Sequence, residues 1–158
     1  MKNIYDAIKA DHDRHRELLS RIGDTSGDST ARNAAWRDFY CDVKSHAAAE
    51  EETFYSHLIS ETWGQDAARH SVHEHQQIDD LLEELNGMDM ANGAWKQKFK
   101  SLRHDYEHHI DEEENEVFAR ARQVIPEGEI AGYGKRFEER KSAERKLVAK
   151  KREDSLED

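Results

Sequence analysis

The stretch at residues 46–51, His-Ala-Ala-Ala-Glu-Glu, recurs 63 residues later at residues 109–114 as His-Ile-Asp-Glu-Glu-Glu. In both places a histidine also stands 34 residues before the stretch, at His12 and at His75. Many matches at one offset indicate an internal repeat, so the chain contains a duplicated unit that keeps histidine and acidic residues. The same displacement matches Asp11 with Glu74, Leu18-Leu19 with Leu81-Leu82, Asp42 with Asp105, and Tyr55 with Phe118.

The composition favours a helical protein of one domain. The chain has 158 residues, of which 35% are hydrophobic and 37% are charged, with a single proline. No apolar run is long enough to cross a bilayer, and Asp6 stands where a signal peptide would begin its apolar region. We therefore expect a cytoplasmic protein that does not enter the membrane. The lone Cys41 cannot form an internal disulfide.

The charge distribution argues against nucleic acid as a partner. The net charge of −11 opposes binding to nucleic acid and to anionic membranes. Residues 135–152, however, contain nine Lys or Arg and three Asp or Glu. We interpret this segment as a basic helix that lies on an acidic bundle, with a partner-binding tail as the alternative. A protein partner is not identified by the sequence.

Hydrophobic periodicity predicts four amphipathic helices, because apolar residues recur at steps of three and four. The first ends before the turn at residues 23–29, and the second runs from about residue 30 to 61, closed by Trp63-Gly64. The third runs from near Asp66 to Asn86, and the fourth ends before the break at residues 123–134. Short links make neighbouring helices antiparallel. We expect an all-α, up-down-up-down four-helix bundle at residues 1–125, with a short charged C-terminal helix in an appendage at residues 126–158.

The inward faces of these helices carry the shared histidines and glutamates. On the second helix the inward stripe runs through His46 and Glu50 and is expected to continue to Thr53 and His57. On the first helix His12 falls on the inward stripe. The candidate ligands from all four helices are His12, His46, Glu50, His75, His109 and Glu113.

Such a set of residues points to metal ions. Buried imidazoles and carboxylates are costly without a partner, and a cation satisfies them together. Imidazole suits iron, zinc and copper, and a glutamate can bridge two ions. Each repeat supplies two imidazoles and one carboxylate, so we expect a dinuclear centre with positions left open for a small ligand.

These residues resemble those of the hemerythrin-like family, also called the HHE cation-binding domain. The pieces that carry the resemblance are Asp11-His12, His46-xxx-Glu50-Glu51, Glu74-His75 and His109-xxx-Glu113-Glu114. The likeness covers residues 1–125. It implies a four-helix bundle with a non-haem centre of two iron ions, bridged by oxo or hydroxo and held by the six candidate ligands.

The sequence departs from the oxygen-carrying members of that family at two places. Those members have a fifth histidine one turn after the ligand on the third helix, where this chain has Asp79. They also place an aspartate five residues after the last histidine, where this chain has Glu113 at four and Glu114 at five. Reversible oxygen transport is therefore not expected. Whether another residue completes the coordination stays open among His15, Glu51, Glu114 and a tyrosine.

The remaining histidines are expected to lie at the surface or beside the metal centre. His104 and His108 are one helical turn apart but are expected to be solvated. The others in this group are His57, His70 and His73.

The resemblance implies a protein that binds dioxygen, peroxide or nitric oxide, in a response to oxidative or nitrosative stress or in iron handling. Two alternatives remain. One is an enzyme that decomposes peroxide at the same centre, in the manner of a catalase. The other is an interaction module in which the metal has a structural role. Whether the protein is an enzyme is left open.

Overall fold

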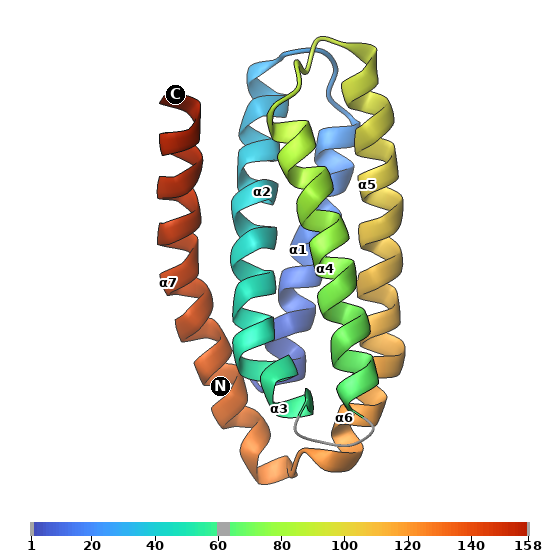
Figure 1. Cartoon of the computed structure of the whole chain (residues 1–158), viewed down its shortest axis with the longest axis vertical. Helices are drawn as coiled ribbons and strands as arrows, with labels where there is room; N and C mark the ends of the chain where they lie inside the picture. The colour runs from blue at the N-terminus through green and yellow to red at the C-terminus, as the bar shows by residue number, and fades with distance from the viewer. Residues whose placement is uncertain (1, 60–63, 158) are drawn as a thin grey trace.

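Long antiparallel helices form a bundle, and a further helix lies alongside it (Figure 1). The computed structural model describes residues 2–59 and 64–157. Within these ranges the chain is helical and has no strand, so the predicted all-α bundle is confirmed. The long helices are α1 (Ile4–Gly23), α2 (Thr30–Glu50), α4 (Gly64–Asn86), α5 (Gly93–Glu112) and α7 (Ile130–Glu157). The shorter elements are η1 (Glu51–Tyr55), α3 (Ser56–Ile59), η2 (Glu113–Val117), α6 (Phe118–Val124) and η3 (Glu127–Glu129).

Side-chain caps fix where three of the long helices begin. The side chains of Asn3, Ser29 and Asn92 accept hydrogen bonds from backbone N–H groups in the first turns of α1, α2 and α5. Each cap satisfies a donor that the helix itself leaves unpaired. The turn between α1 and α2 includes Gly27 with φ of 61°, a conformation that favours glycine. The predicted closure of the second helix at Trp63 lies outside the described residues.

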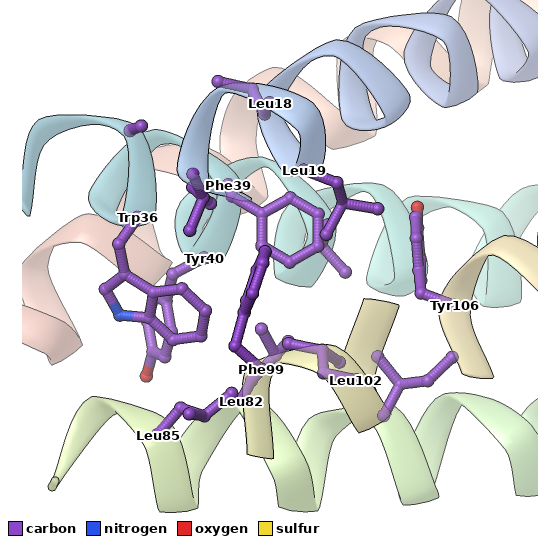
Figure 2. Packing of buried hydrophobic residues seen from close by; sticks show 14 of the residues in the cluster. Leu18, Leu19, Trp36, Phe39, Tyr40, Leu82, Leu85, Phe99, Leu102 and Tyr106 are labelled. Atoms are coloured by element: carbon purple, nitrogen blue, oxygen red, sulfur yellow. The ribbon is translucent and has the colours of Figure 1, made fainter. Parts of the chain in front are cut away.

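Two apolar clusters fill the bundle, one on each side of the candidate ligands. The first cluster contains Trp36, Phe39, Trp95 and Phe99, and Figure 2 shows aromatic rings from this group packed between the helices. Trp95 stacks on Phe99 with ring centroids 5.4 Å apart, and Trp36 meets Trp95 edge-on at 5.5 Å. The second cluster contains Ile4, Ile8, Phe54, Tyr55, Leu58, Phe118 and Phe137. The ligand layer is thus closed by tightly packed side chains at both ends.

The C-terminal helix is longer than the short helix that the sequence predicts. α7 has 28 residues and packs along α2 and α1, where Figure 1 shows it running beside α2. Its residues after Gly134 include neither proline nor glycine and are mostly good helix formers, so nothing in the sequence stops the helix early. Phe137 is buried against the second cluster. Lys141 pairs with Asp11 and Asp42, and Arg145 also pairs with Asp42, which confirms a basic helix on an acidic bundle.

The start of α7 lies very close to the start of α1. A Cβ atom built on Gly134 would lie 2.8 Å from the carbonyl carbon of Asn3, so only glycine fits there without movement. No described helix is both long enough and apolar enough to span a membrane.

Candidate metal centre

The six candidate ligands converge in one buried layer of the bundle. His12 comes from α1, His46 and Glu50 from α2, His75 from α4, His109 from α5, and Glu113 begins η2. All six side chains are buried. They form two groups, and one potential ligand atom from each member lies within 4.8 Å of the others in its group. The first group is His12, His46, Glu50 and Glu113, and the second is His75, His109, Glu50 and Glu113.

Both glutamates belong to both groups. Glu50 has one oxygen 3.2 Å from His46 Nε2 and the other 3.0 Å from His75 Nε2. Glu113 likewise has its oxygens 3.2 Å from His12 Nε2 and 3.7 Å from His109 Nε2. Each carboxylate therefore spans the space between the two pairs of histidines. This is the placement that a carboxylate needs in order to bridge two metal ions.

Several inward atoms lack hydrogen-bond partners among the described residues. Both oxygens of Glu50, one oxygen of Glu113 and His46 Nε2 are buried without a hydrogen bond. His75 Nε2 and His109 Nε2 face each other at 3.1 Å. Buried polar atoms are normally paired, because an unpaired one costs roughly 1–3 kcal/mol. A group of unpaired nitrogen and oxygen donors aimed at a common space fits a metal site.

Four outer carboxylates hold the outward nitrogens of the four histidines. His46 Nδ1 lies 2.7 Å from Asp11, and His109 Nδ1 lies 2.9 Å from Glu74. His12 Nδ1 lies 2.8 Å from Glu114, and His75 Nδ1 lies 3.2 Å from Glu51. A carboxylate accepts a hydrogen bond and so favours the tautomer with the proton on Nδ1. The lone pair of each Nε2 is then directed at the centre, where a metal would bind.

The outer carboxylates follow the internal repeat. Asp11 and Glu74 are matched by the displacement of 63 residues, and so are Glu51 and Glu114. The first pair holds a histidine of the same repeat, whereas the second pair reaches across to a histidine of the other repeat. From the sequence alone, Glu51 and Glu114 remained open as metal ligands. The structure places both on the outer side of the histidines.

A wide helical turn begins directly after Glu50, and another begins at Glu113. The π-helical segments η1 and η2 begin at Glu51 and at Glu113, so the predicted continuous α-helices are interrupted at the site. The extra residue in each turn shifts the inward stripe. Phe54, Tyr55 and Leu58 are buried after Glu50, whereas Thr53 and His57 are only partly buried. The prediction that Thr53 and His57 continue the inward stripe is therefore wrong.

The carboxylates control the protonation of the metal-free centre. Burial alone would lower the pKa of His46, but Glu50 and Asp11 outweigh it and raise the pKa to about 10. Burial is likewise outweighed at His75, where Glu50 and Glu51 raise the pKa to about 10. Burial would raise the pKa of Glu50, but His46 and His75 lower it well below its usual value. Without metal, protons on the histidines compensate the buried carboxylate charge.

A second buried hydrogen-bond chain adjoins the centre. Tyr106 Oη pairs with His15 Nδ1, and His15 Nε2 lies 2.6 Å from Asp42. Burial lowers the pKa of His15 to about 4, so the imidazole is neutral, donating to Asp42 and accepting from the tyrosine hydroxyl. Both ring nitrogens of His15 are thereby engaged, which argues against it as an additional ligand. On the other side, Tyr55 Oη donates a hydrogen bond to Glu113.

A cavity of about 210 Å³ reaches the centre between α2 and α4. The four candidate histidines and Tyr106 line it, together with Glu51 and Gln76. Its remaining walls are mostly apolar and include Val43, Ala47, Ile78, Leu82 and Ile110. Lys44 and Asp79 also line the cavity, and their side chains form an ion pair of 3.0 Å. Asp79, at the position where the oxygen carriers have a fifth histidine, thus pairs with a lysine.

The other histidines lie away from the centre. His70, His73, His104 and His108 are exposed. His57 forms a hydrogen bond of 2.7 Å with Tyr133. None of them belongs to either ligand group in the part of the chain that the structure describes.

One solved structure shares the fold, and one curated protein is similar in sequence. A solved structure of an HHE cation-binding domain-containing protein, a Rv2633c homolog from Mycobacterium kansasii, matches with a TM-score of 0.83 and 23% identity, over 93% of this chain and 90% of that one. At this identity the match shows the shared fold. A curated protein named DNA nickase, from Nostoc sp. (strain PCC 7120 / SAG 25.82 / UTEX 2576), is 25% identical over 140 residues. This match covers 89% of the chain but only 39% of the longer nickase.

The family comparison covers most of the chain. The model of the hemerythrin HHE cation-binding domain matches residues 3–121, which include all six candidate ligands and the four outer carboxylates. The chain therefore belongs to the hemerythrin HHE cation-binding domain family.

Proposed function

We propose that this protein holds two iron ions and binds dioxygen, nitric oxide or peroxide at them. The observation that carries the proposal is the pair of ligand groups that share Glu50 and Glu113. His12 and His46 would hold one ion, His75 and His109 the other, and the two glutamates would bridge them. Iron in such a nitrogen and oxygen environment supplies redox chemistry and open positions for an exogenous ligand.

The residues present favour an exchangeable ligand over a saturated metal. Each group offers two imidazoles and two shared carboxylates, which is fewer protein ligands than six-coordinate iron accepts. Asp79 is held by Lys44, and His15 by Tyr106 and Asp42, so neither is directed at the metals. The positions left open suit redox turnover or sensing more than reversible oxygen transport.

The cavity indicates the class of ligand. It reaches the histidines from the gap between α2 and α4, and most of its wall is apolar. A small ligand of low polarity, such as dioxygen or nitric oxide, loses little solvation on entering such a space. We place the function in the response to oxidative or nitrosative stress or in iron handling, and we keep the sequence-based expectation of a cytoplasmic location.

The optical response of the iron-loaded protein tests this proposal. The metal-free protein is loaded with Fe²⁺ without oxygen, its iron content is measured, and absorption spectra are recorded before and after oxygen is admitted. We expect two irons per chain and a near-ultraviolet band that depends on oxygen. His46→Ala should lose iron and the band, whereas His73→Ala, an exposed histidine on α4, should keep both.

Two results would contradict the proposal. A chain that retains one zinc ion, unfolds when the metal is removed, and shows no absorption response to oxygen or reductant would be an interaction module with a structural metal. Normal iron content and a normal band in His46→Ala would show that His46 does not hold the metal.

A peroxide-decomposing activity at the same centre is a second candidate. It is favoured by the hydrogen-bond chain from Tyr106, which lines the cavity, through His15 to Asp42. Peroxide disproportionation requires protons to be moved between oxygen atoms, and a hydroxyl that is hydrogen-bonded to a neutral imidazole can relay them.

Oxygen release from peroxide tests this second candidate. The iron-loaded protein should exceed free iron, and Tyr106→Phe should slow the release by about 10²-fold without changing the iron content. Release by the wild-type protein at the rate of free iron would exclude the activity.

A further inference from the structure

A third group of metal-binding side chains lies on the surface of α4 and α5. His70 Nε2 is 3.3 Å from Glu74 on the same helix and 3.5 Å from Glu112 on the neighbouring helix. One ligand atom from each of these three residues lies within 4.8 Å of the other two. His108 Nε2 lies 3.5 Å from the other oxygen of Glu112. The group therefore combines imidazoles and carboxylates, as the buried centre does.

The spacing of these residues suits chelation. His70 and Glu74 are four residues apart on α4, and His108 and Glu112 are four residues apart on α5. Residues at this spacing lie one turn apart on the same face of a helix. α4 and α5 pack against each other, so the two pairs meet across the helix interface. A hollow of about 130 Å³ beside them is lined by Glu74, His108 and Asp105, among others.

In the other half of the bundle, the residue that corresponds to Glu74 is paired with a cation. Asp11, the repeat counterpart of Glu74, holds His46 with one oxygen and receives Lys141 from α7 at 2.8 Å on the other. Glu74 holds His109 with Oε1. Its other described ion pair, to His70, uses the same oxygen, and His70 is more than half exposed. One oxygen of Asp11 thus faces a fixed cation, whereas no described ion pair uses Oε2 of Glu74.

The residues around the two positions differ accordingly. The repeat counterparts of His70, His108 and Glu112 are Ala7, Ser45 and Ala49. These small residues are buried in the half that α7 covers. In Figure 1, α7 runs along α2 on the side of the bundle away from α5. At these matched positions the half covered by α7 thus has small buried residues, whereas the other half has metal-binding side chains.

We propose that His70, Glu74 and Glu112 form a second, surface site for a divalent transition-metal cation, with His108 as a further ligand. Nitrogen and carboxylate donors of this kind suit Zn²⁺. The bound ion pairs with Glu74 as the Lys141 ammonium pairs with Asp11. Because Glu74 also holds His109, one side chain links the surface ion to the buried centre.

Zinc binding to the full-length chain tests the proposal. Zn²⁺ is titrated into the iron-loaded protein, and bound zinc per chain is measured by equilibrium dialysis. We expect one zinc ion beyond the metal of the buried centre, lost in His70→Ala and in Glu112→Gln. His73→Ala is the matched control, because His73 is also exposed on α4 but stands outside the group. The iron content of His70→Ala should equal that of the wild type.

The difference in bound zinc between His70→Ala and His73→Ala reports on the surface site alone, whatever metal the buried centre holds. The test can therefore fail or succeed independently of the proposed function. Equal zinc binding by the two variants and the wild type would overturn the proposal. So would the absence of any additional zinc in the wild type. Circular dichroism checks that the variants remain folded, which the exposure of both histidines favours.

Discussion

At the scale of single residues, each of the four histidines at the centre has a carboxylate on its outer nitrogen. The repeat allowed the six inner residues to be predicted, because histidine and glutamate recur together at one offset. It also matched Asp11 with Glu74 and Glu51 with Glu114. The roles of these outer residues were not predicted, since helix periodicity places Glu51 and Glu114 about 100° from the inward face. An acid retained in both repeats was the signal that could have identified them.

Replacing an outer carboxylate should weaken metal binding while the six inner residues remain intact. Glu114→Gln removes the charge that holds His12 Nδ1. We expect metal affinity to fall by about 10–100-fold. Glu116→Gln, which changes an exposed residue nearby, should have no effect. Competition with a chelator of known affinity measures both variants, and equal affinities would show that Glu114 does not support the centre.

Metal binding should release protons. His46 and His75 have a pKa of about 10 in the metal-free protein, so both are protonated at neutral pH and must lose a proton to bind metal. Affinity should therefore rise with pH toward 10. Calorimetry in two buffers of different ionisation enthalpy measures the released protons. Metal binding without proton release at pH 7 would contradict this assignment.

The same raised pKa values give the metal-free protein a pH-dependent stability. The protonated histidines favour the folded state, and this contribution is complete below the unfolded pKa of about 6.5 and is lost as pH rises through 10. Urea unfolding of the metal-free protein should show a lower free energy of unfolding at pH 9.5 than at pH 7. Stability that does not change between these pH values would contradict the proposed ion pairs.

At the scale of helices, the π-helical turns η1 and η2 explain why the inward stripe changes register at the centre. The prediction for residues 30–61 assumed a uniform α-helix and therefore selected Thr53 and His57. A clue lay in the sequence, because Phe54, Tyr55 and Leu58 are apolar, whereas Thr53 and His57 are polar. The wide turn itself could not be predicted from periodicity, which assumes one repeat length throughout a helix.

The contact between α7 and α1 can be tested at Gly134. Gly134→Ala forces a Cβ against the backbone of Asn3 and should lower the free energy of unfolding by about 1–3 kcal/mol. Gly132→Ala is the matched control, since its Cβ meets no atom within 4 Å, and alanine should leave stability unchanged or improve it by up to about 1 kcal/mol. Urea unfolding measures both. Equal stability of the two variants would argue that α7 does not dock at this point.

At the scale of the whole molecule, the bundle is close to a two-fold repeat that α7 makes asymmetric. The duplicated sequence predicted four helices and one central layer of ligands. It did not predict that α7 extends through 28 residues, or that Lys141 reaches Asp11. Those contacts join residues 130 positions apart in the chain, and only packing reveals them. We propose that residues 1–125 form the metal-binding bundle and that residues 126–158 brace one of its halves.

The positions of the metal ions test the central claim most directly. Crystals of the iron-loaded protein, measured at the iron absorption edge, should show two anomalous peaks between Glu50 and Glu113. A carboxylate-bridged pair places them about 3.5–4 Å apart. One peak should adjoin His12 and His46, and the other His75 and His109. A single peak, or peaks that leave either glutamate without contact to both ions, would contradict the account.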